Sequence, residues 1–190
     1  MLELHMAVII SLLRGVNLAG HKPVKMDALR SLYDSLGLRD AQTFINSGNV
    51  LFRTGARDLD PIRKRVEKGI ERSFGFHADV MMRTSAELRE VIAKNPFAAR
   101  NGIDPKRLVV SFLAGEPGPE AREKALGIKA EPEELRISGR ELYIYFPHGL
   151  ARPTLSTALL EKTLKLSGTN RNWNTVTKLL QLAEGMEDGP

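Results

Sequence analysis

AVIISLL, at Ala7–Leu13, is the part of the sequence that limits the choice of folds most. It is rich in β-branched residues, and apolar side chains occupy both alternating sets of positions, Ile10 and Leu12 on one and Ile9 and Leu13 on the other. A strand that is apolar on both faces is buried on both faces. We therefore expect a first β-strand here, in a sheet whose second face is covered by another part of the chain.

Helical spacing, caps and turn residues mark the elements that follow in the first half. Asp60-Pro61 is a typical helix start, Gly37 and Gly75 stand where helices stop, and Ser47-Gly48-Asn49 is a hairpin signal. The predicted elements are a helix at Leu29–Leu36, strands at Thr43–Asn46 and Val50–Arg53, a helix at Asp60–Phe74 and a strand at Ala78–Met82. With the first strand, this β-α-β-β-α-β order is the ferredoxin-like pattern.

The second half contains a further set of α and β elements. The predicted elements are a helix opened by the capping box Thr84–Glu87, a strand at Arg107–Leu113, a short helix ending near Gly127, a hairpin of Leu135–Ser138 and Glu141–Phe146, a long helix through Leu155–Leu164, and a last helix capped by Asn172 or Thr169. The element order echoes that of the first half, which suggests a duplication. We predict an α+β protein in which a ferredoxin-like subdomain (6–83) packs against a second α+β subdomain (84–183), followed by a disordered tail (184–190).

Composition excludes several classes of protein. The 190 residues include 28 Lys and Arg against 23 Asp and Glu, which gives a net charge of +5 and a pI of about 9.6, and there is no Cys. A disulfide framework, a thiolate metal site and a Cys nucleophile are therefore absent. The four His are scattered, no G-x-S-x-G motif occurs, and no apolar run reaches membrane length. We expect a cytoplasmic protein with no metal, no cofactor and no membrane partner.

The loop after the first strand contains the pattern G-x4-G at Gly15–Gly20. A nucleotide P-loop continues with Lys and Ser or Thr into a helix, whereas here His21 follows and Pro23 prevents a helix from starting. The loop is then either an anion-binding loop that uses Arg14, Lys22 and Lys25 or an ordinary glycine-rich connection.

Three other polar segments could present donors to a ligand. The turn Asn46–Asn49 and the segment Arg152–Ser156 supply amides, hydroxyls and an Arg, although turn formation and helix initiation explain the same residues. The segment Thr169–Thr175 carries three Asn, Arg171 and the single Trp before a predicted helix, which is more than a helix cap needs. The predicted ligand-binding residues are Arg14, Asn17, Lys25, Asn46, Ser47, Asn49, Arg152, Asn170, Arg171 and Asn172.

Several of these motifs, in their order along the chain, resemble an uncharacterised, mainly bacterial family, the domain-of-unknown-function family numbered 1697. The residues that carry the resemblance are Leu12–Asn17, Val24–Met26, Phe44–Phe52, Asn95–Phe97 and Thr169–Val176, within a match over Ala7–Leu182. The resemblance implies an α+β protein with a ferredoxin-like N-terminal part, and it implies no known reaction. Where the family often shows a Lys, two residues after Arg152, this chain has Thr154.

The sequence leaves three functions open. The first is binding of a phosphate-bearing ligand, a small molecule such as a nucleotide or a nucleic acid, through the Gly/Asn/Arg loops. The second is a non-catalytic interaction module, in which these loops are structural. The third is an enzyme acting on a small phosphorylated or polar metabolite, for which the sequence offers no acid–base pair. The catalytic residues, if any, and the oligomeric state stay open.

Overall fold

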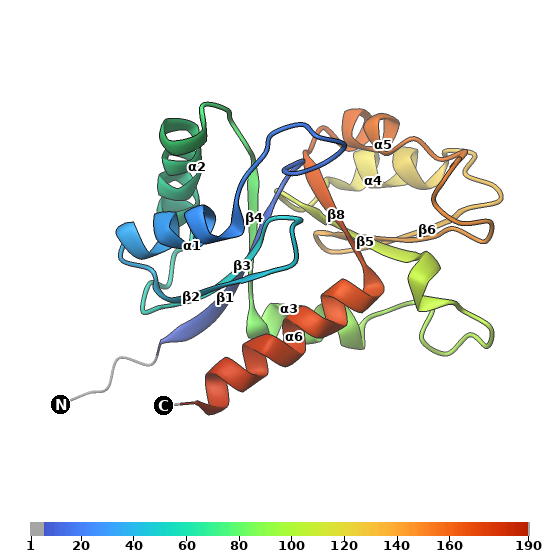
Figure 1. Cartoon of the computed structure of the whole chain (residues 1–190). Coiled ribbons are helices and arrows are strands. Elements are labelled where there is room, and N and C mark those ends of the chain that lie inside the picture. Colours follow the sequence, from blue (N-terminus) through green and yellow to red (C-terminus); the bar gives the residue numbers. More distant parts are fainter. Residues whose placement is uncertain (1–5, 190) are drawn as a thin grey trace. The chain divides into compact units, whose positions relative to one another are not determined.

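The structure, a computed structural model, describes residues 6–189 as a mixed α+β protein with two four-stranded antiparallel sheets and six α-helices (Figure 1). The elements are β1 (Ala7–Leu13), α1 (Met26–Ser35), β2 (Arg39–Phe44), β3 (Asn49–Thr54), α2 (Asp60–Phe74), β4 (Val80–Thr84), α3 (Ser85–Ala93), β5 (Leu108–Leu113), α4 (Pro119–Leu126), β6 (Glu134–Ser138), β7 (Glu141–Tyr145), α5 (Thr157–Leu164), β8 (Gly168–Asn172) and α6 (Trp173–Asp188), with a 3-10 turn at Pro105–Arg107. No helix in this part of the chain is long and apolar enough to cross a membrane.

The chain forms two compact units, and the first is discontinuous. It comprises the residues up to Arg89 together with those from Leu179 onward, whereas the second is the continuous stretch from Glu90 to Lys178. The chain therefore leaves the first unit within α3 and re-enters it within α6.

In the first unit, β1 lies inside the sheet, as its apolar sequence predicts. The strand order is β2-β3-β1-β4, all antiparallel, so that β1 pairs on both sides. Ile9 and Leu13 face a core that α1 and α2 supply with Leu29, Tyr33 and Ile70. Ile10 and Leu12, on the opposite face, are equally buried. The prediction of a strand buried on both faces is confirmed.

The C-terminal part of α6 lies against the face of the first sheet that points away from α1 and α2. Arg53 follows Phe52 in β3 and therefore points to this opposite face, where its guanidinium donates to the carbonyls of Met186 and Gly189. Ser85, at the start of α3, forms a hydrogen bond with Glu187. These contacts correct the prediction of a disordered tail over 184–190 as far as its described residues, 184–189, are concerned, because the helix continues to Asp188. Residue 190 lies outside the described residues.

The second unit has the same strand order, β6-β7-β5-β8, again antiparallel throughout. Its core lies between the sheet and helices α4 and α5. Equivalent backbone bonds close the two hairpins onto the neighbouring strand, from Leu13 N to Gly48 O (2.9 Å) and from Leu113 N to Arg140 O (2.9 Å). In both units the last strand runs without a break into a helix, α3 or α6.

Three parts of the prediction differ most from the structure. The residues of β8 were predicted to lead into and cap the last helix, at Asn172 or Thr169, but they form a strand that pairs with β5. β2 begins earlier than the predicted strand and ends at Phe44. Both are edge strands of mostly polar sequence, which lack the apolar alternation that reveals a strand. The predicted long helix is the 8-residue α5.

Tyr33 provides a test of the first core. Its hydroxyl shares a 2.6 Å hydrogen bond with the buried Ser11, and burial raises its pKa well above the usual value near 10. The folded protein keeps this proton above about pH 10, whereas the unfolded chain loses it, so stability falls as pH rises. We expect Tyr33→Phe to have a free energy of unfolding about 1–2 kcal/mol lower than the wild type at neutral pH, because the hydroxyl of Ser11 loses this partner. Above about pH 10 the stability of the variant should fall less steeply with pH than that of the wild type. Urea unfolding at several pH values measures both, and an unchanged alkaline slope would contradict the prediction.

Candidate functional site

A pocket of about 600 Å³ opens in the second unit beside the start of α5. Its cause is the length of that helix. The equivalent helix of the first unit, α2, has 15 residues and brings Ile62 and Val66 into the core, whereas α5 has only 8. The loop from Phe146 to Ser156 stands in place of the missing turns and leaves space over the edge of the sheet.

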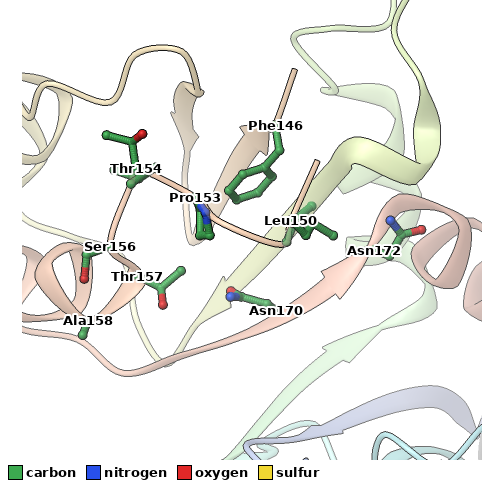
Figure 2. A pocket seen from close by; sticks show the side chains of 11 residues that line it. Phe146, Leu150, Pro153, Thr154, Ser156, Thr157, Ala158, Asn170 and Asn172 are labelled. Atoms are coloured by element: carbon green, nitrogen blue, oxygen red, sulfur yellow. The ribbon is translucent and has the colours of Figure 1, made fainter. Parts of the chain in front are cut away.

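The pocket combines an apolar wall with neutral polar groups (Figure 2). The apolar wall consists of Val109, Phe146, Leu150, Pro153, Leu155 and Ala158, and the polar groups belong to Thr154, Ser156, Thr157, Asn170 and Asn172. None of these eleven lining residues is ionisable. Leu150 is 48% exposed, so the pocket has an apolar rim that reaches solvent. Such a site suits an uncharged molecular group that offers both apolar surface and hydrogen bonds.

A buried carboxylate holds the loop that forms one side of the pocket. Glu133 is only 5% exposed, and its carboxylate accepts hydrogen bonds from the backbone N–H of Thr154 (3.2 Å) and Leu155 (3.0 Å). Glu133 is buried although it belongs to an acidic stretch, Glu131–Glu134. The alternation of side chains along a strand indicates this burial, since Glu133 lies two residues before the buried Leu135.

Ser156 fixes the start of α5 at the edge of the pocket. It is the N-cap residue, and its hydroxyl accepts a hydrogen bond from the N–H of Leu159 (3.2 Å). Thr154 and Thr157, on either side of this cap, add two further hydroxyl groups to the lining. The predicted helix start at Arg152–Ser156 therefore both initiates α5 and supplies part of the pocket.

Strand β8 contributes two amide side chains that play different roles. Asn172 is committed to structure, because its Nδ2 donates to Lys106 O (2.9 Å) and its Oδ1 accepts from Asn174 N (3.0 Å), which caps α6. The side-chain amide of Asn170 makes no hydrogen bond with the described residues, and Figure 2 shows it directed toward the side on which Thr157 lies. Asn170 therefore has a free donor and a free acceptor for a ligand.

The third predicted residue of this segment, Arg171, lies inside the strand and is 6% exposed. Its guanidinium donates to the hydroxyl of Thr169 (2.8 Å) and to the carbonyl of Asn170 (2.8 Å). Burial lowers the pKa of Arg171 to about 10. Arg152, which belongs to the other predicted segment of the second unit, is exposed in the loop between Leu150 and Pro153.

The other predicted residues lie in the first unit, where Asn17 joins two of the predicted segments. Its amide donates to Asn46 O (2.9 Å) and Val24 O (2.9 Å) and accepts from Val24 N (2.7 Å). The loop after β1 and the turn between β2 and β3 therefore meet. The side chain that joins them is fully used in holding the backbone.

The remaining predicted residues of the first unit have varied surroundings. Asn49 is buried and donates to Phe44 O (3.0 Å) and to the hydroxyl of Ser47 (2.8 Å), so both residues stabilise the turn. Arg14 forms an ion pair with Asp79 (3.4 Å), and Lys25 is exposed before α1. Asp79 also contacts the exposed His77 (3.0 Å), a pair that no motif in the sequence indicated.

Comparisons with known proteins agree with this fold. A family model described as "Protein of unknown function (DUF1697)" matches residues 6–143. A solved structure of the conserved bacterial protein SP0830 from Streptococcus pneumoniae is similar, with a TM-score of 0.70 and 21% sequence identity, over 94% of this chain and 99% of that chain. No curated protein matches the sequence. At this identity the structural similarity concerns the fold alone.

Proposed function

We propose that this protein, which belongs to the DUF1697 family of proteins of unknown function, binds a small phosphate-bearing molecule such as a nucleotide, with the uncharged part of that molecule inside the pocket of the second unit. One observation carries the proposal: the pocket has an apolar wall, neutral polar groups and the uncommitted amide of Asn170, with no ionisable lining residue. A flat heterocycle with donors and acceptors on its edge fits this combination.

The phosphate of such a ligand belongs outside the pocket. The start of α5 would attract an anion, but the carboxylate of Glu133 already binds the backbone just before it, at Thr154 and Leu155. A second negative charge there would be repelled. Arg152 is exposed in the loop that forms the rim, and it is the cation we assign to the phosphate.

We also propose that the first unit has the ferredoxin-like arrangement. The strand order β2-β3-β1-β4, with α1 and α2 packed on one face, supports a ferredoxin-like arrangement of the first unit. The second unit has the same strand order.

The proposal predicts how four variants bind a panel of nucleosides and their monophosphates. Binding is measured from the NMR chemical shifts of the labelled protein. Asn170→Ala and Thr157→Val each remove one hydrogen bond, so we expect affinity for the best nucleoside to fall about 2- to 10-fold. Arg152→Gln should weaken the monophosphate a few-fold and leave the nucleoside unchanged. Lys162→Gln, an exposed residue of α5 outside the lining, is the charge-matched control.

Two results would contradict the proposal. One is the absence of shift changes at the pocket for every compound. The other is binding that Asn170→Ala and Thr157→Val leave unaltered, which would place the ligand elsewhere.

A further inference from the structure

We infer that the first unit holds a separate site for an oxyanion, a carboxylate or a phosphate group, between the side chains of Arg39 and Arg53. A groove of about 1290 Å³ lies there, and its lining includes the three arginines Arg39, Arg53 and Arg89. They come from the start of β2, the end of β3 and α3. All the groove's lining residues belong to the first unit, so this site is independent of the pocket described above.

The strand register places two of these arginines directly opposite one another. Arg39 and Arg53 are direct partners in the antiparallel pairing of β2 with β3. Like charges placed directly opposite one another on neighbouring strands repel and destabilise the pair. An anion bound between them would convert this repulsion into two attractive interactions, and the groove gives it room to enter.

The charges in the groove are unequally compensated. Arg53 contacts Asp40 (3.5 Å) and donates to two carbonyls at the end of α6, and Arg89 forms ion pairs with Glu184 (3.0 Å) and Glu187. Arg39 differs. Among residues 6–189, its only side-chain hydrogen-bond partner is the sulfur of Met6 (3.9 Å), and no carboxylate lies within ion-pair distance of it. Arg39 is the cation that still lacks an anion.

Two guanidinium groups in one groove match an acceptor that carries several oxygens, which both carboxylates and phosphates do.

Thermal unfolding with inorganic phosphate tests this site, with potassium chloride at equal ionic strength as the reference. We expect phosphate to raise the Tm of the wild-type protein and to have no such effect on Arg39→Gln. Arg57→Gln, an exposed arginine outside the groove, is the charge-matched control and should respond like the wild type. Without phosphate, Arg39→Gln should be at least as stable as the wild type, because the substitution removes a repulsion.

A second measurement locates the anion and identifies its class. The side-chain Nε–H signals of Arg39 and Arg53 should shift on titration with phosphate in the wild type, with at least about tenfold weaker binding to Arg39→Gln. Parallel titrations with acetate and citrate distinguish a carboxylate from a phosphate ligand.

The site is overturned if phosphate and chloride have equal effects, if phosphate stabilises Arg39→Gln as much as the wild type, or if Arg39→Gln unfolds at a lower temperature than the wild type without phosphate. Because none of these variants touches the pocket of the second unit, failure here leaves the nucleotide proposal unchanged, and the reverse also holds.

Discussion

Gly48→Ala is expected to lower the free energy of unfolding by about 2–5 kcal/mol. Gly48 lies in the turn between β2 and β3 with φ +72°, a conformation that costs an L-residue about 1–2 kcal/mol. A Cβ atom there would stand 2.4 Å from Val16 Cγ2 and 2.8 Å from Leu13 Cβ. Both neighbours are buried, so relieving this overlap adds about 1–3 kcal/mol. Urea unfolding of the purified variant measures the sum.

Gly20→Ala separates these two contributions. Gly20 has φ +80°, but a Cβ atom there would meet nothing within 4 Å. Gly20→Ala should therefore lower the free energy of unfolding only by the conformational contribution, about 1–2 kcal/mol. If Gly48→Ala proved no more destabilising than Gly20→Ala, the close packing of Gly48 on Val16 and Leu13 would be refuted.

Glu133→Ala is expected to lower the free energy of unfolding by about 3–6 kcal/mol, because the backbone N–H groups of Thr154 and Leu155 each lose a charged acceptor worth about 1.5–3 kcal/mol. Glu133→Gln should lower the free energy of unfolding by less than Glu133→Ala does, since its amide oxygen can still accept hydrogen bonds from the N–H groups of Thr154 and Leu155. Urea unfolding gives the global cost. Amide hydrogen exchange at Thr154 and Leu155 reports the loop, and these two amides should exchange faster in Glu133→Ala.

Glu131→Ala is the matched control for this carboxylate. Glu131 is exposed two residues before Glu133, so its removal should change stability by no more than about 0.5 kcal/mol. Equal stabilities of Glu131→Ala and Glu133→Ala would show that the buried carboxylate does not hold the loop.

Local signals in the sequence predicted much of the fold. The helix predicted at Asp60–Phe74 matches α2, because Pro61 at its start and Gly75 after its end mark both limits. The capping box is also confirmed, since Thr84 Oγ1 accepts from Glu87 N (3.1 Å) and Glu87 accepts from Thr84 N (2.8 Å). β8 escaped prediction because its sequence, GTNRN, has no apolar alternation and owes its conformation to pairing with β5.

The candidate site could be predicted only in part. Asn170 and Asn172 were predicted as ligand-binding residues on the number of polar side chains in one segment, and both line the pocket. The sequence did not predict that Phe146 and Leu150 line a pocket, because the pocket depends on how far α5 falls short of covering its sheet. The length of a helix relative to the sheet beneath it is a tertiary property, which no short motif encodes.

The division of the first unit between two distant parts of the chain has a consequence for protein synthesis. Arg53, Ser85 and Arg89 are made early, whereas the carbonyls and carboxylates that they contact lie at residues 184–189. The second unit is continuous, so all of its residues leave the ribosome before those last partners do. The unit that begins first is therefore completed last, and until then the hydrogen bonds and ion pairs that join its sheet and α3 to residues 184–189 cannot form.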